Sequence, residues 1–394
     1  MRAVFSRIGF RISSDANAVT GTLICAALIG RRVFLLAVIV LAAVKLASRL
    51  HPGKRAEIEP SSSEEERAVR PARRTTEAAF HPPAGLDCPA MPDVSSLRDA
   101  LRAVLVGQHA VIEALMISLI AGGHILLEGA PGLAKTLACR TLVESVKGSF
   151  ARIQCTADLM PADVLGCEIF DPRDLAFRTR LGPLFANVVL LDEINRAPAR
   201  TQAALFEALH ERQVTLGGQT YALPDPFVVL ATMNETDPDG IFPLPAAQLD
   251  RFLLKVLLDF PDASEELEIL ERFGSGVTRQ PRPVVSIEQV RAWRGVAETI
   301  YCAPSIRRYI VDLVCATRNK ALERGAGPRA CLALLRAGRA KAMLAGRNFV
   351  VPADIRGIAG AALRHRVVFA RGFLLKREEN ESRLGELVDS APLP

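Results

Sequence analysis

The stretch HILLEGAPGLAKT, residues 124–136, decides the fold, because an apolar strand runs into a glycine-rich turn that opens a helix. The turn consists of Gly129, Ala130, Pro131, Gly132, Leu133, Ala134, Lys135 and Thr136. Glycines let backbone N–H groups approach phosphate oxygens, and the start of a helix adds a partial positive charge. The pattern therefore predicts a phosphate-binding loop between a buried strand and a helix.

In such a loop Lys135 would place its ammonium against the β- and γ-phosphates of ATP, and the Thr136 hydroxyl would bind Mg²⁺. Ala134 departs from the general pattern G-x-x-x-x-G-K-[ST], which has Gly at this position. A methyl group is compatible with the loop if the local φ angle is negative. Taken alone, the stretch also fits an ordinary strand–turn–helix connection with a surface lysine.

Two further apolar strands end in polar side chains. The run VVLL at residues 188–191 is followed by Asp192 and Glu193, and Asn234 follows the run FVVLAT at residues 227–232. Open α/β sheets bind ligands at the carboxyl ends of their strands. Asp192 would hold Mg²⁺, Glu193 would act as a base toward water, and Asn234 would contact the γ-phosphate or that water. Taken alone, Asp192 and Glu193 also fit a solvated acidic turn, and Asn234 also fits an ordinary turn-forming asparagine.

Apolar strands alternate with helical segments between residues 93 and 262. This alternation predicts an α/β fold, a P-loop parallel sheet with helices on both faces. Two hairpins interrupt it, at Glu168–Arg180 and at Gln213–Leu223. Beyond Phe260 the sequence becomes mostly helical, which predicts a C-terminal all-α lid domain over residues 263–380 and a tail over residues 381–394.

The first 92 residues have a different composition. Residues 18–50 carry two apolar stretches flanked by Arg and Lys, which fit a membrane anchor, an export signal or a vestigial extension. Export would separate the chain from ATP, so we expect a cytoplasmic protein with a candidate anchor to the inner face of the membrane. Residues 51–92 are rich in Pro, Ser, Glu and Arg, which predicts a disordered linker. Ser95 and Ser96 are candidate N-caps of the first helix.

Composition narrows the classes of partner. The net charge of +6 is spread along the chain, and the few Tyr and Trp residues (three and one) do not cluster with basic residues, so we expect no specific nucleic acid. The eight cysteines contain no C-x-x-C pair, which favours reduced thiols over a zinc site.

The motifs resemble those of the MoxR family of AAA+ ATPases from about Leu97 to Arg371. The matching blocks include GAPGLAKT, RIQCTADLMPADVLG, VVLLDEINRAP, ATMNETDPDGIFPLPAAQLDRF and GPRACLALLRAGRAKAMLAGRNFVVPADI. This resemblance implies an AAA+ core with a helical lid, and Ala is common at position 134 in the family. It also implies roles that spacing cannot supply. Asn234 is similar to sensor 1, Arg251 to the arginine finger that reaches a neighbouring subunit's nucleotide, and Arg329 to sensor 2, in a lid over the same nucleotide.

An arginine acting across a subunit interface makes hydrolysis depend on assembly. The resemblance therefore implies a homo-oligomeric ring, with a hexamer as the expected size and the hairpins on its pore or substrate side. Expected partners are proteins with von Willebrand A domains, which the chain would remodel or assemble in the manner of a chaperone. The alternatives are a nucleotide-dependent regulator without mechanical work, a nucleic-acid motor and a small-molecule P-loop kinase.

Overall fold

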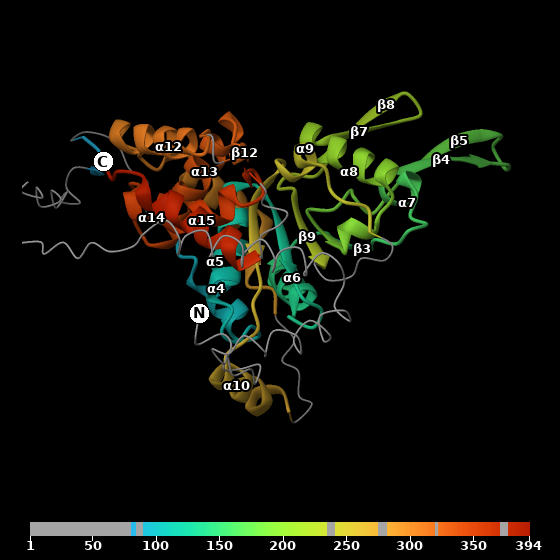
Figure 1. The fold of residues 1–394 in the computed structure, drawn as a ribbon. Helices are drawn as coiled ribbons and strands as arrows, with labels where there is room; N and C mark the ends of the chain where they lie inside the picture. Colours follow the sequence, from blue (N-terminus) through green and yellow to red (C-terminus); the bar gives the residue numbers. More distant parts are fainter. Residues whose placement is uncertain (1–79, 84–89, 235–240, 275–281, 320–321, 371–376) are drawn as a thin grey trace, which may run out of the picture. The chain divides into compact units, whose positions relative to one another are not determined.

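The computed structural model describes residues 80–83, 90–234, 241–274, 282–319, 322–370 and 377–394. A five-stranded parallel sheet lies at its centre, in the order β10-β1-β9-β6-β3 (Figure 1). In that order the strands are Phe252–Leu257, His124–Gly129, Val228–Asn234, Val188–Asp192 and Phe150–Gln154. All residues of β1 and β6 are buried, as continuous apolar runs in a covered parallel sheet require. The predicted fold is confirmed.

The two faces of the sheet lie in separate apolar cores. Successive side chains of a strand point to opposite faces, so Val188 and Leu190 join one core while Val189 and Leu191 join the other. The first core contains helices α4 (Ser95–Arg102), α5 (His109–Ala121) and α6 (Lys135–Glu144). The second contains residues of α8 (Ala199–Glu211).

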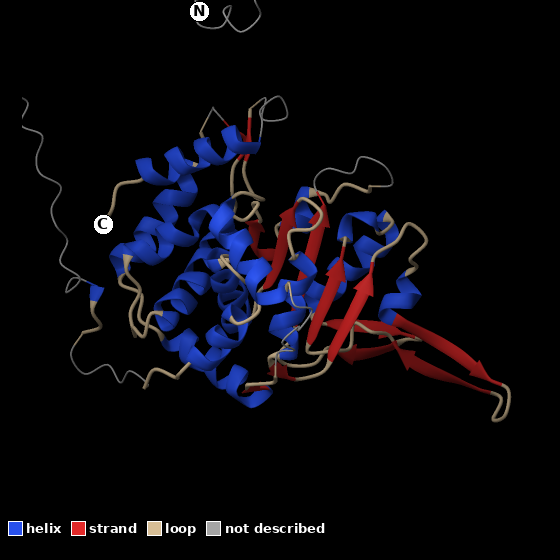
Figure 2. Cartoon of the chain, turned by 90° about the horizontal axis from the view of Figure 1, so that it is seen from below, coloured by secondary structure: helices blue, strands red, loops and turns tan. Residues whose placement is uncertain are grey.

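Both predicted hairpins are present, and they extend away from the sheet (Figure 2). Strands β4 (Gly166–Asp171) and β5 (Ala176–Leu181) form the first, after the short helix α7 (Pro161–Leu165). Strands β7 (Gln213–Leu216) and β8 (Gln219–Ala222) form the second. Gly217 and Gly218 both have positive φ at its tip, as a tight turn requires. The remaining short elements of this region are β2 (Val146–Lys147), η4 (Ile194–Arg196) and α9 (Ala246–Leu249).

The C-terminal part of the chain is mostly helical, as expected. Its helices are α10 (Ala263–Phe273), α11 (Ile287–Thr299), α12 (Pro304–Ala316), α13 (Pro328–Leu344), α14 (Pro352–Leu363) and α15 (Arg377–Ser390). Its short strands are β11 (Val285–Ser286), β12 (Leu322–Arg324) and β13 (Val368–Phe369). Helix α13 packs against α5, which joins the helical part to the first core.

Three expectations differ from the structure at the edges of these domains. Residues 381–390 are not a tail, because they continue α15 and bury Leu384 and Val388. The linker expectation fails at Phe80, which is 3% exposed within the first core. Ser95 and Ser96 do not cap α4 but lie inside it, and Asp93 accepts the Ser95 N–H instead.

The candidate membrane segment, residues 18–50, lies outside the described residues. Among the helices that are described, none is long and apolar enough to cross a membrane.

Candidate functional site

The phosphate loop lies between β1 and α6, as the sequence predicts. Gly132 has a φ of 87°, and Ala134, just before the helix, has a φ of 58° and a ψ of 23°. The condition of a negative φ at Ala134 is therefore not met. A left-handed conformation costs an L-residue roughly 1–2 kcal/mol, and alanine has only a methyl group to place there. Ala134 thus adopts the left-handed conformation for which the general pattern has glycine.

Lys135 is 7% exposed and directs its ammonium back into the loop. Its Nζ donates to the carbonyl oxygens of Gly129 and Ala130, at 2.5 and 2.9 Å, and to Oδ1 of Asn234 at 2.7 Å. Burial lowers the pKa of Lys135, while the nearby carboxylates of Glu193 and Asp192 act in the opposite direction. The ammonium therefore sits at the carboxyl edge of the sheet, between the loop and β9.

Asp192 ends β6 across from the loop. Thr136 donates to its Oδ1 at 3.0 Å, Thr232 donates to Oδ1 at 2.6 Å, and Arg152 donates to Oδ2 at 2.7 Å. Burial acts to raise the pKa of Asp192, but hydrogen bonds from Thr232, Arg152 and Thr136 outweigh it and lower the pKa. The carboxylate is thus ionised and lies beside a hydroxyl. Such hard oxygen ligands suit Mg²⁺.

Glu193 follows in a left-handed conformation with a φ of 55°. Its Oε1 accepts from Asn234 Nδ2 at 2.7 Å, and its Oε2 lies 2.9 Å from Arg196 Nε. Because Asn234 also accepts from Lys135, one amide connects the lysine to the glutamate. The structure therefore brings together the loop, both carboxylates and the asparagine.

Sequence reasoning missed three polar side chains of this cluster: Thr232, Arg152 and Arg196. Thr232 binds both Asp192 and the backbone N–H of Glu193, at 2.6 and 2.9 Å. A polar residue two positions before Asn234, inside an apolar strand, is a signal that could have identified it. Arg152 lies on the edge strand β3, where an arginine is unremarkable without knowledge of its neighbour β6.

Arg251 and Arg329 lie at the opposite edge of the sheet. Arg251 directly precedes β10, whose first residue pairs with His124 at the start of β1, whereas the loop follows the end of β1. The six residues of β1 span five intervals of about 3.3 Å each, so the two edges are roughly 17 Å apart. Among the described residues, Nε and Nη1 of Arg251 are buried without a hydrogen-bond partner.

Arg329 begins α13 and lies near Arg251, not over the loop. Its Nη1 is 3.5 Å from Oδ2 of Asp250, and its Nη2 is 3.4 Å from Nε2 of His210. Arg329 therefore lies away from its own chain's loop and on the same side as Arg251. The physical reason is that α13 packs on α5, whose C-terminal end lies at the start of β1.

Asp250 is itself held by a buried arginine. Arg366, whose side chain is 3% exposed, donates to Oδ1 of Asp250 at 2.7 Å and to the Phe252 carbonyl at 2.7 Å. Burial lowers the pKa of Arg366, and the hydrogen bond that Arg366 donates to Asp250 opposes this effect. Arg366 thus fixes the carboxylate beside Arg329, linking the end of α14 to the segment that carries Arg251.

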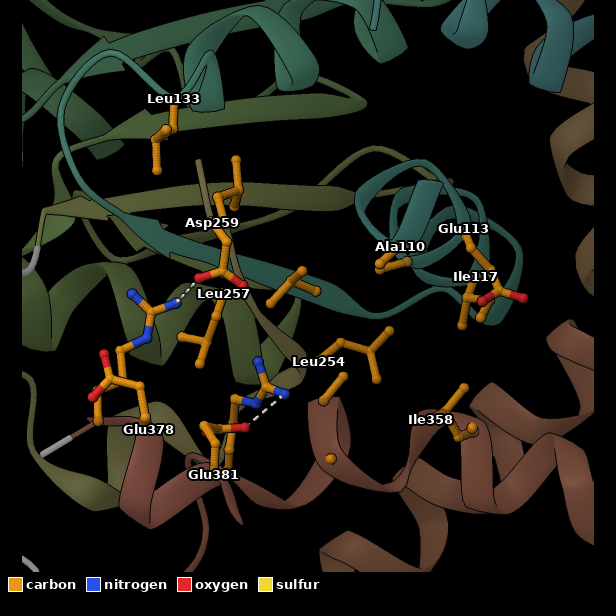
Figure 3. A pocket seen from close by; sticks show the side chains of 18 of the residues that line it. Ala110, Glu113, Ile117, Leu133, Leu254, Leu257, Asp259, Ile358, Glu378 and Glu381 are labelled. Carbon is orange, nitrogen blue, oxygen red and sulfur yellow. Dashed lines mark hydrogen bonds and ion pairs between the residues drawn. The ribbon is translucent and has the colours of Figure 1, made fainter. Parts of the chain in front are cut away.

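A cavity of about 1030 Å³ adjoins the phosphate loop (Figure 3). Ala130 and Leu133 of the loop line it, together with side chains of α5, α14, α15 and the segment after β10. Figure 3 shows two ion pairs in it, Arg377 with Asp259 and Arg364 with Glu381, each at 3.0 Å. The apolar parts of this wall lie next to the loop, where the rest of a bound nucleotide would extend.

Comparisons with known proteins agree with this geometry. Residues 124–254 match the ATPase family associated with various cellular activities (AAA), and residues 316–387 match the AAA lid domain. Chaperone MoxR1 of Mycobacterium tuberculosis is 37% identical over 326 residues, covering 79% of this chain and 86% of the relative. The chain belongs to the MoxR family of AAA+ ATPases.

Two further comparisons also cover most of the chain. Protein MoxR of Paracoccus denitrificans is 31% identical, over 74% of this chain and 92% of that protein. A solved structure from Cytophaga hutchinsonii is 37% identical with a TM-score of 0.67, over 74% of this chain and 92% of that one. The similarity therefore extends over both the AAA+ core and the lid.

Proposed function

We propose that this MoxR-family chain binds ATP with Mg²⁺ at the phosphate loop, hydrolyses it, and uses the cycle to remodel a partner protein. One observation carries the proposal: Lys135, Thr136, Asp192, Glu193 and Asn234 converge at one edge of the sheet. A surface lysine or a solvated acidic turn would not produce this hydrogen-bonded set. The set is also what phosphoryl transfer needs, namely charge stabilisation and a positioned base.

Each residue of this set has a role that follows from its contacts. The Thr136 hydroxyl and the Asp192 carboxylate would hold Mg²⁺, which when bound neutralises charge on the phosphate oxygens. Lys135 would exchange its carbonyl partners for phosphate oxygens of ATP. Glu193 would accept a proton from water, and Asn234 keeps that carboxylate oriented through a 2.7 Å hydrogen bond. The cavity beside Ala130 and Leu133 would take the base and ribose.

Arg251 and Arg329 would act on the nucleotide of a second copy. Both lie at the edge of the sheet opposite their own loop, and β1 between the two edges is roughly 17 Å long. Head-to-tail contact between copies brings opposite edges together, and such contacts close into rings when the rotation permits. We propose a ring, with a hexamer as the expected size, in which these arginines complete the site of the neighbouring copy.

The β4–β5 hairpin supports a role in contacting a partner protein. Phe170 and Phe177 form an aromatic pair 5.4 Å apart on it, and both are exposed, as is Leu175 near its tip. Exposed apolar groups of this kind mark protein interaction sites. We propose that a protein with a von Willebrand A domain is remodelled here. A regulator that binds nucleotide without mechanical work is the alternative, and sustained turnover coupled to a change in such a partner would separate the two.

Asparagine in place of Asp192 tests the metal part of this proposal. We expect Asp192→Asn to raise the Mg²⁺ concentration needed for half-maximal ATP hydrolysis by about 10- to 100-fold, because the site loses the carboxylate that we propose holds the ion. Mg²⁺ titrations at saturating ATP measure the shift, and thermal unfolding reports the fold. Asp312→Asn, which removes an exposed carboxylate on α12, is the control. An unchanged Mg²⁺ requirement in Asp192→Asn would remove Asp192 from the metal site.

A further inference from the structure

Helix α10 has an outward face that covers nothing in the described structure. None of its residues is buried, and Leu267 and Leu270 are 57% and 68% exposed. Glu266 and Glu271 lie on the same exposed side, so the face combines two leucines with two carboxylates. The helix is nevertheless held in place. Asp262 caps its N-terminus, and Arg272 donates to the carbonyl of Arg102 at the end of α4.

Helix α13 presents a face of matching character. Arg329, Leu332 and Arg336 recur at helical spacing and are all exposed, with Leu332 at 60%. They line a hollow of about 240 Å³ that also contains the side chains of Arg212, Arg251 and Arg366. Among the carboxylates of the described residues, Asp250 alone lines this hollow, so the charge there is strongly positive.

The two faces cannot meet within one chain. Helix α10 follows β10 at the carboxyl edge of the sheet and packs near Gly107, just before α5 begins. The α13 face lies at the other end of α5, where Arg336 donates to the carbonyls of Ala121 and Gly122. The 13 residues of α5 hold the two regions roughly 20 Å apart, and Figure 1 shows α10 at the bottom of the view and α13 near the top.

We propose that the exposed face of α10 docks on the exposed face of α13 in a second copy of this chain. The inference rests on the proposed head-to-tail assembly and adds the contact that holds it beside the nucleotide. In that contact, Leu267 and Leu270 cover Leu332, while Glu266 and Glu271 face Arg329 and Arg336. Charge complementarity selects this pairing, because α10 carries the acidic side chains and α13 the basic ones.

Charge variants at Leu332 provide the test, because Leu332 is exposed and is not part of the proposed catalytic set. Leu332→Glu and Leu332→Arg lose the same apolar contact but differ in charge. Glu266 and Glu271 of the second copy repel the carboxylate introduced by Leu332→Glu and attract the guanidinium introduced by Leu332→Arg. We expect Leu332→Glu to associate at least about tenfold more weakly than Leu332→Arg. Mass photometry in a slowly hydrolysed ATP analogue and Mg²⁺ measures this association.

A second substitution should restore what the first removes. Leu270→Lys alone places a positive charge against Arg329 and Arg336, and we expect it to weaken association. Combined with Leu332→Glu, it recreates an opposite-charge pair and should recover most of the lost association. Equal assembly of Leu332→Glu and Leu332→Arg, or a double variant no better than Leu332→Glu, would overturn the proposed contact.

Nucleotide binding is measured separately on the same proteins. Each variant should bind the analogue with wild-type affinity at concentrations below assembly, because both helices lie outside the phosphate loop. Wild-type chain that assembles without binding the analogue would overturn the proposed function while leaving the α10–α13 contact standing. If the wild-type chain binds the analogue and all charge variants associate as tightly as one another, only the contact is overturned.

Discussion

Glutamine in place of Glu193 should leave ATP binding intact and slow steady-state hydrolysis by about 10²- to 10⁴-fold, the usual contribution of a general base. Glutamine keeps the size of the side chain and can still accept the hydrogen bond from Asn234, which is 2.7 Å away in the structure. It cannot accept a proton from water. Binding should therefore survive while the chemical step fails.

Equilibrium titration with ATP and a phosphate-release assay separate these two effects. Glu144→Gln is a suitable control, because Glu144 pairs with Arg140 on the surface of α6 and takes no part in the site. Turnover of Glu193→Gln within a few-fold of wild type would exclude Glu193 as the base.

Removal of the Lys135 ammonium should weaken ATP binding by at least about 100-fold, because hydrogen bonds to charged groups contribute roughly 1.5–3 kcal/mol each and the ammonium would make more than one. Lys135→Ala also leaves the carbonyls of Gly129 and Ala130 and the Asn234 amide oxygen without this donor. Some loss of thermal stability is therefore expected beside the loss of binding.

The appropriate comparison is Lys147→Ala, which removes an exposed lysine at the end of β2. Isothermal titration of both variants, at temperatures well below their unfolding transitions, gives the two affinities. If ATP bound Lys135→Ala as tightly as Lys147→Ala, the phosphate-loop assignment would be wrong.

The contacts among Lys135, Asp192, Glu193 and Asn234 could be predicted from sequence because each residue directly follows an apolar strand or a glycine turn. Parallel strands place all their carboxyl ends at one edge, so the order of motifs along the chain is enough to bring these side chains together. The strand order β1-β9-β6, which sets β9 between the loop and Asp192, comes from the structure.

The position of Arg329 could not be predicted in the same way. It depends on how α13 packs against α5, and this depends on the shapes of two apolar helix faces far apart in sequence. The same holds for Arg366, which reaches Asp250 across 116 positions of the chain. The left-handed Ala134 was missed for a local reason, since sequence alone does not show which backbone conformation a permissive residue adopts.

Mixing two inactive variants tests most directly whether the hydrolytic site is built from two copies. Arg251→Ala keeps its own loop and Glu193, while Glu193→Gln keeps Arg251. In mixed assemblies the intact arginine should complete the intact loop of its neighbour, so the mixture should hydrolyse ATP well above the sum of its parts. A mixture of Arg251→Ala with the double variant Arg251→Ala/Glu193→Gln should gain nothing. Absence of rescue in the first mixture, with co-assembly verified, would contradict the account.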